Sequence, residues 1–241
     1  MQHVQHNHAA DRDARDAFDS VRLDVGPGFA LWLTNLIRPP AQERLAWLSE
    51  NESRKASRFV FERDRRRYLA AHGELRALLS SRLAIAPEQL EFEVGPFGKP
   101  RLTNSSSCAF NLSHSEDVAV VLISDEGHIG VDVEMLRPVP DALALAQRNF
   151  SDEECAVLAE VDIAQRDLAF LAGWTRKEAC LKAIGSGLSI APQTFSAGLA
   201  HVAHCTLIRT PQGIAEVTVR SFVHEQRMLI AWARLETLAS D

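Results

Sequence analysis

The stretch VAVVLISDEGHIGVDVEML, residues 118–136, decides how the chain is organised. Residues 118–124 form an uninterrupted apolar run of the length of a buried strand, and residues 128–136 indicate a second strand. Asp125, Glu126 and Gly127 lie between them and are typical of a tight turn. We therefore expect two consecutive strands here, and we divide the chain into two halves at this turn.

Outward from this stretch, helices and strands occur in blocks. Further candidate strands lie at 29–37, 91–94, 205–210, 214–221 and 227–235. Candidate helices with apolar periodicity lie at 65–83, 151–161 and 167–184. Because the two kinds of element do not alternate strictly, the pattern favours an α+β fold over a doubly wound sheet. We expect a mobile polar tail over 1–28, an N-terminal half over 29–125 and a C-terminal half over 126–241.

Composition limits the class of protein. The 241 residues carry a formal net charge of −6, which argues against a nucleic-acid binder. No apolar run reaches 18 residues, so we expect no membrane span, and the polar N-terminus lacks the apolar core of a signal peptide. The four cysteines form no C-x-x-C pair, so reduced thiols in a cytoplasmic protein are the simplest interpretation.

Two stretches place acidic and basic side chains on one face. In GVDVEMLRP, residues 130–138, Asp132 and Glu134 are two apart on a strand and share a face, where magnesium would neutralise them. In WTRKEACLKAIGSGLS, residues 174–189, Glu178 and Lys182 are one helical turn apart. The alternatives are a solvent-facing strand and an ordinary surface ion pair.

Two further stretches suit an anionic ligand. In FNLSHS, residues 110–115, neighbouring side chains of an extended chain point apart, so Ser113 and His114 fit phosphate binding better than a nucleophile with its base. Residues 54–67 hold seven Lys or Arg and two acids, a balance of +5, and Lys99 adds a cation in a glycine-proline turn. The alternatives are a structural turn and a solvated helix face.

These motifs together resemble the Sfp-type 4′-phosphopantetheinyl transferases. They occur in that family's order: G-K-P (98–100), F-N-[IL]-S-H-S (110–115), G-[IV]-D-[IV]-E (130–134), and W-x-x-K-E-x-x-x-K followed by G-x-G-L-S (174–189). The resemblance covers roughly residues 29–235. It implies two similar α+β halves related by a pseudo-twofold, with coenzyme A bound between them. It also implies transfer of phosphopantetheine to a serine of an apo acyl, peptidyl or aryl carrier protein, with release of adenosine 3′,5′-bisphosphate.

The resemblance also assigns roles to residues. Asp132, Glu134 and Glu178 match the magnesium ligands, and Lys182 matches the lysine beside the pyrophosphate. The positions that match coenzyme A contacts are Lys55, Arg67, Lys99, Ser113 and His114. Tyr68 stands where the family often has a smaller residue beside the adenine. Glu178 or a metal-bound water would serve as the base for the attacking serine.

The carrier protein stays open at this stage, since fatty-acid, polyketide and nonribosomal-peptide carriers all fit. We expect a monomer, because one chain would supply both halves of the site. Residues 148–161, with Phe150 and Leu158, are a candidate partner surface. The alternatives are a magnesium-dependent phosphohydrolase, which would release phosphopantetheine without a carrier, and a non-catalytic coenzyme A-binding module.

Overall fold

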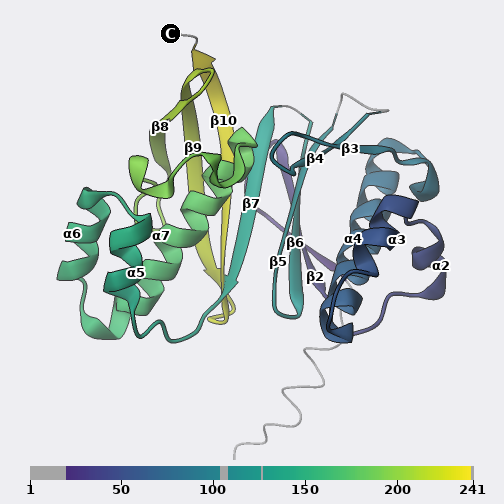
Figure 1. Cartoon of the computed structure of the whole chain (residues 1–241), viewed down its shortest axis with the longest axis horizontal. Coiled ribbons are helices and arrows are strands. Elements are labelled where there is room, and N and C mark those ends of the chain that lie inside the picture. The colour runs from purple at the N-terminus through teal and green to yellow at the C-terminus, as the bar shows by residue number, and fades with distance from the viewer. Residues whose placement is uncertain (1–19, 104–107, 126, 240–241) are drawn as a thin grey trace, which may run out of the picture.

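The computed structural model describes residues 20–103, 108–125 and 127–239 of the chain (Figure 1). The elements up to residue 125 are β1 Ser20–Leu23, β2 Phe29–Asn35, α2 Gln42–Ala46, α3 Glu50–Ala56, α4 Glu62–Leu83, η1 Pro87–Gln89, β3 Phe92–Val94, β4 Pro100–Leu102, β5 Ala109–Ser115 and β6 Val118–Ser124. The later elements are β7 His128–Met135, α5 Ala142–Asn149, α6 Asp152–Glu160, α7 Ile163–Ile184, η2 Gly187–Ser189, η3 Pro192–Thr194, β8 His204–Thr210, β9 Gly213–His224 and β10 Met228–Ala239.

The strands build two antiparallel sheets and a small ribbon. The first sheet has the order β1-β2-β6-β5, the second has the order β7-β10-β9-β8, and β3 pairs with β4. Figure 1 shows the two sheets next to each other in the middle, with α2 to α4 on one outer side and α5 to α7 on the other. Strands and helices thus occur in separate groups, which confirms the α+β class.

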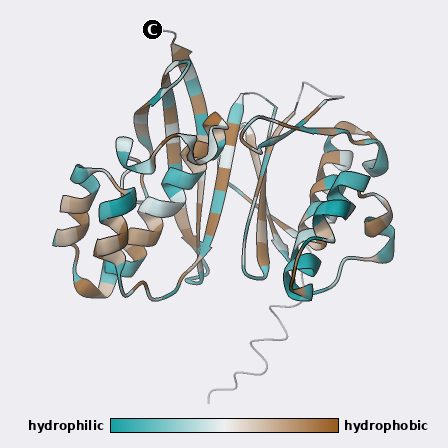
Figure 2. Cartoon of the chain, viewed as in Figure 1, coloured by the Kyte–Doolittle hydropathy of each residue, from teal (hydrophilic) through white to brown (hydrophobic). Residues whose placement is uncertain are grey.

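The core follows from the alternation of side chains along the strands. One face of β2 and β6 and one face of β7 and β10 meet in a shared apolar cluster that includes Leu31, Val120, Val131 and Ile230. The opposite face of the first sheet packs on α4, and the opposite face of the second sheet packs on α7. The layers are therefore helix, sheet, sheet, helix. Figure 2 shows hydrophobic residues in the central strands and hydrophilic turns on α4.

The structure confirms one expectation and corrects another. Residues 118–124 and 128–135 are the two consecutive strands expected; β6 pairs with β2 and β5, whereas β7 pairs with β10. The two strands therefore belong to different sheets. The expected tail is too long, because Ser20–Leu23 pair with β2 as β1. Residues 1–19 lie outside the described part of the chain.

The three helix predictions are confirmed, and two of these helices start earlier than expected. The predicted helix at 65–83 begins at Glu62, and the one at 167–184 begins at Ile163. The capping box at α6 is present, since Ser151 and Glu154 exchange bonds between side chain and backbone. Within the described residues, no helix is both long and apolar enough to cross a membrane.

Buried charges tie the helices together on each side of the molecule. On the first side, the Glu52 carboxylate of α3 accepts from His72 Nδ1 at 2.9 Å and from Arg76 Nη2 at 2.6 Å, both on α4. On the second side, Lys177 Nζ of α7 lies 2.7 Å from Glu154 Oε2 of α6, and both side chains are buried. Each pair also bonds to neighbouring backbone groups, which satisfies the remaining polar atoms.

Candidate active site

A glycine brings β7 and α7 into direct contact. A Cβ at Gly130 would overlap the carbonyl oxygen of Ala179 and the amide nitrogen of Ala183 on α7. The side chains of β7 on this face, Asp132 and Glu134, therefore lie against the helix that carries Glu178 and Lys182. A glycine inside a strand marks a close approach of this kind.

Asp132 is the centre of a hydrogen-bonded cluster. Its Oδ1 accepts from Lys182 Nζ at 2.6 Å and from Ser113 Oγ at 2.7 Å, and Lys182 Nζ also donates to Ser113 Oγ at 2.9 Å. Asp132 and Ser113 are buried, whereas the Lys182 side chain is 28% exposed. The structure thus brings together three of the predicted site residues, from β5, β7 and α7.

Glu178 and Glu134 add negative charge beside this cluster. Burial raises the pKa of Glu178, and the Asp132 and Glu134 carboxylates raise it further, although Lys182 opposes them. Glu134 Oε2 accepts a hydrogen bond from Arg137 Nη1 at 2.9 Å, near the C-terminal end of β7. Glu178 therefore holds a proton more readily than an ordinary glutamate does.

Side chains of β5 fasten the edge of the first sheet to β7. Asn111 Oδ1 accepts from the amide of Val131 at 2.8 Å, and Ser115 Oγ accepts from the amide of Met135 at 3.3 Å. Ser113 lies between them and reaches Asp132. We call Asn111, Ser113 and Ser115 the β5 seam, since these alternate residues join the two sheets.

His114 points to the other side of β5. Its neighbours in the alternation, Phe110 and Leu112, pack toward α4. The imidazole lies at the surface, yet partial withdrawal from water lowers its pKa, and the positive charges of Lys182, His72 and Arg67 lower it further. His114 is therefore mostly neutral at pH 7, with one ring N–H to donate.

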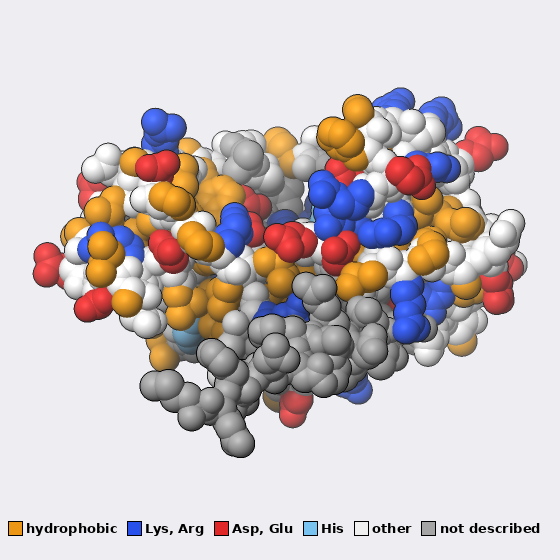
Figure 3. Space-filling model, turned by 90° about the horizontal axis from the view of Figure 1, so that it is seen from below, with side chains coloured by type: hydrophobic (Ala, Val, Ile, Leu, Met, Phe, Trp, Pro, Cys, Tyr) orange, Lys and Arg blue, Asp and Glu red, His pale blue; other side chains and the backbone are white. Residues whose placement is uncertain are grey.

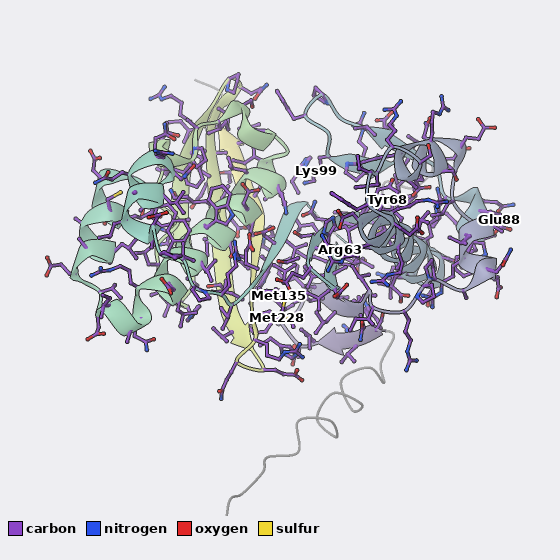
Figure 4. The ribbon with its side chains drawn as sticks, turned by 60° about the horizontal axis from the view of Figure 1, so that its bottom comes forward. Arg63, Tyr68, Glu88, Lys99, Met135 and Met228 are labelled. Atoms are coloured by element: carbon purple, nitrogen blue, oxygen red, sulfur yellow. The ribbon has the colours of Figure 1, made fainter. Side chains whose placement is uncertain are left out.

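The Lys99 side chain forms hydrogen bonds with backbone carbonyls. Its Nζ donates to the Ile129 carbonyl of β7 at 2.8 Å and to the Ala183 carbonyl of α7 at 3.2 Å. Burial lowers its pKa to about 8. The side chain therefore fixes the 95–99 turn against the second sheet. Figure 4 shows Lys99 between the two halves, above Arg63 and Tyr68.

The predicted basic segment is partly neutralised. Arg67 Nε donates to Asp117 Oδ1 at 2.9 Å, which raises the pKa of Arg67. Lys55 is exposed, and its Nζ lies 5.4 Å from the centre of the Tyr68 ring. Tyr68 is buried between Phe59 and His72, with ring centroids 5.4 and 4.0 Å away. Figure 3 shows Lys and Arg side chains gathered with acids on this half of the molecule.

The oxygen donors suit magnesium in kind, and the Asp132 and Glu134 carboxylates, which add to the effect of burial in raising the pKa of Glu178, are charges that a cation would neutralise. The positions of these carboxylates, however, do not form a complete metal site. Among the described residues, no group of three or more His, Cys, Asp or Glu side chains is gathered closely enough to hold a metal ion. Lys182 instead occupies Asp132 Oδ1.

Sequence reasoning missed several residues of this region. Asn111 and Ser115 could have been found, because they alternate with apolar residues on the same strand face as Ser113. Lys177, next to Glu178, faces away from the site and is buried with Glu154. The candidate partner surface at 148–161 is wrong in its anchors, because Phe150 and Leu158 are 2% and 0% exposed.

Comparisons with known proteins point to one enzyme family. A family model described as the 4′-phosphopantetheinyl transferase superfamily matches residues 128–233, and one described as 4′-phosphopantetheinyl transferase, N-terminal, matches residues 39–126. The two matches meet where the chain passes from the first sheet to the second.

Relatives extend the similarity over most of the chain. The 4′-phosphopantetheinyl transferase HetI of Nostoc sp. is 38% identical over 164 residues, which cover 66% of this chain and 69% of HetI. The 4′-phosphopantetheinyl transferase psf-1 of Bacillus pumilus is 32% identical over 185 residues, 77% of this chain and 78% of the relative. The 4′-phosphopantetheinyl transferase ffp of Bacillus subtilis is 30% identical over 166 residues, 67% of this chain and 73% of the relative.

Proposed function

Because the chain belongs to the 4′-phosphopantetheinyl transferase superfamily and is an enzyme that transfers phosphopantetheine from coenzyme A to carrier proteins, we propose that it does so at the Asp132 cluster. The observation that carries this proposal is the meeting of Asp132, Ser113 and Lys182 from three elements beside Glu178. A surface ion pair would not be built from three separate strands and helices with two buried members.

Each residue of the cluster has a proposed role. Lys182 faces the pyrophosphate of coenzyme A and offsets charge on the departing phosphate. Ser113 holds Asp132 and Lys182 at hydrogen-bond distance from each other. Glu178 or a metal-bound water accepts the proton of the carrier serine. Asp132, Glu134 and Glu178 would hold Mg²⁺, which when bound neutralises the pyrophosphate oxygens.

For coenzyme A itself we propose contacts on the first half. His114 offers a neutral ring N–H, and Lys55 and Arg67 offer cations. Lys99 already donates to two carbonyls, so we assign it the placement of the 98–100 turn beside the ligand. Two similar halves, 29–125 and 126–241, related by a pseudo-twofold, would then enclose coenzyme A. The order of two four-stranded sheets, each backed by a long helix, supports this arrangement.

We further propose that the enzyme acts as a cytoplasmic monomer on a carrier of fatty-acid, polyketide or nonribosomal-peptide synthesis. Both sides of the site come from one chain, so a second copy adds no residue to it. Light scattering on the active protein checks this, since activity that follows a dimer or trimer peak would contradict it.

Mass spectrometry tests the reaction. Apo-carriers are incubated with the enzyme, coenzyme A and magnesium, and a gain of the phosphopantetheine mass on a serine identifies the substrate. A parallel reaction with coenzyme A alone separates transfer from hydrolysis, because a phosphohydrolase releases phosphopantetheine without a carrier. Coenzyme A binding without transfer to any carrier would instead indicate a non-catalytic binding module.

A further inference from the structure

The segment between α3 and α4 exposes three consecutive apolar side chains. Phe59, Val60 and Phe61 are 36%, 90% and 66% exposed. We call residues 57–61 the α3–α4 loop. Contiguous exposed apolar groups of this kind mark interaction sites more often than single exposed residues do. Phe59 rests on the Tyr68 ring, so the loop is fixed to α4.

The same loop is bordered by cations without acidic partners. Arg65 and Arg67 form ion pairs with Glu62 and Asp117. In contrast, Lys55 and Arg58 form no ion pair within the part of the chain that the structure describes. Aromatic residues and arginine are enriched where protein interfaces carry most of their binding energy.

The loop lies beside the site. Tyr68 contacts Phe59 on one side and His72 on the other, and the charge of His72 acts on His114. Figure 4 shows Arg63 and Tyr68 on the side of α4 that faces the second sheet. The loop is thus linked through Tyr68 and His72 to His114, which we assign to coenzyme A binding.

We propose that the α3–α4 loop is a docking surface for the carrier protein, which meets it with acidic side chains around an apolar patch. The proposal rests on the transfer reaction proposed above. Charge complementarity selects an acidic partner, since unpaired cations frame the apolar residues. A protein fits better than an anionic membrane, because acidic side chains are interspersed with the basic ones on this half (Figure 3).

The test separates the carrier from coenzyme A. Steady-state kinetics are measured for Val60→Ser/Phe61→Ser and for Arg58→Glu, with a carrier that the wild type modifies. We expect the KM for the carrier to rise about tenfold, equivalent to 1.4 kcal/mol, with kcat and the KM for coenzyme A within about twofold. Leu207→Ser is the matched control, because Leu207 is 65% exposed but lies on β8, at the far edge of the second sheet.

Three results overturn the proposal: an unchanged carrier KM in both variants, an equal rise in the KM for coenzyme A, or an equal effect of Leu207→Ser. Co-sedimentation with phosphatidylglycerol–phosphatidylcholine vesicles gives a fourth. Vesicle binding that the double variant loses, with carrier KM unchanged, assigns the loop to a membrane surface. Absence of turnover by the wild type on every carrier would count against the transfer reaction itself, which keeps the two hypotheses distinct.

Discussion

Lys177 and Lys182 lie on the same helix with the same charge, but they face opposite parts of the protein. Lys177 is fully buried against Glu154 and donates to the Pro192 carbonyl. Lys182 is partly exposed and holds Asp132 and Ser113. The first lysine supports the fold, and the second belongs to the site.

Substitution of these two lysines should therefore affect different properties, stability for Lys177 and turnover for Lys182. Lys177→Met leaves the buried Glu154 carboxylate without its cation, so we expect a loss of about 3–5 kcal/mol in the free energy of unfolding. Lys182→Met should cost less of this free energy, because Lys182 is partly exposed and Ser113 still donates to Asp132, and it should lower kcat instead. Urea denaturation and carrier modification, measured on both variants, check this. Equal destabilisation by both substitutions would show that the division is wrong.

Glu178→Gln should remove most turnover without loss of stability. A residue acting as the base contributes about 10²–10⁴-fold to the rate, so we expect kcat to fall by that order. The raised pKa means that the charged carboxylate is disfavoured in the fold, so its neutral isostere should be at least as stable. Turnover and thermal unfolding are measured together, and near-wild-type transfer by the folded variant would exclude Glu178 from the site.

Between elements, Gly130 sets the distance from β7 to α7. Gly130→Ala places a methyl group on the Ala179 carbonyl and the Ala183 amide, so β7 or α7 must shift. We expect a loss of about 1–3 kcal/mol in the free energy of unfolding and lower kcat, because Asp132 and Lys182 separate. Gly95→Ala is the control, since its Cβ would lie 3.3 Å from the Lys99 carbonyl oxygen. Equal effects at both positions would refute a special role for this contact.

The α3–α4 pair should give the fold an acid-sensitive step. Burial would raise the pKa of Glu52, but hydrogen bonds from His72, Arg76 and Ser49 lower it from 4.5 to about 2. The charged carboxylate therefore stabilises the fold above pH 4.5, and this contribution is lost as pH falls toward 2. The size is about 3 kcal/mol, from 1.36 kcal/mol per pKa unit.

Urea denaturation at several pH values checks this step. Glu52→Gln should be less stable than the wild type at pH 7, and the difference between the two should shrink between pH 4.5 and 2. A difference that does not change with pH would show that Glu52 acts through packing alone.

At the level of elements, local patterns were sufficient for most helices and strands. The Ser151–Glu154 capping box and the apolar run of β6 are signals contained within a few residues. Two features were not local. Whether residues 125–127 close a hairpin depends on β10, which pairs with β7 from about a hundred residues away. The bond between Asp132 and Lys182 likewise spans 50 residues.

For the whole molecule, the net charge of −6 means that an anionic ligand is attracted only where cationic side chains are gathered. We expect coenzyme A to bind about tenfold or more tightly than dephospho-coenzyme A, because charge-assisted contacts to its 3′-phosphate contribute about 1.5–3 kcal/mol each before desolvation. Lys55→Ala and His114→Ala should weaken coenzyme A binding alone, and the preference should shrink at high salt. Calorimetric titration of both ligands measures this, and equal affinities in the wild type would exclude a 3′-phosphate site.

Part of the site also depends on the assembly of the two sheets. The resemblance indicated Ser113, Asp132 and Lys182, and the structure shows these three in contact. The hydrogen bond from Lys99 to the Ile129 carbonyl could not be predicted from the sequence of the 95–99 turn, because that carbonyl belongs to the second sheet. Arg67 could not be assigned to Asp117 either, since 50 residues separate them.

The β5 seam makes two amides report on the junction of the sheets. The N–H groups of Val131 and Met135 donate to the side chains of Asn111 and Ser115, whereas most strand amides donate to carbonyls. A small separation of the sheets would break these two bonds and leave the β7–β10 ladder intact. Deuterium uptake at Val131 and Met135 would then exceed that of their neighbours along β7. Exchange at these two amides would thus measure how often the junction between the sheets opens, with no dye or spin label attached to the protein.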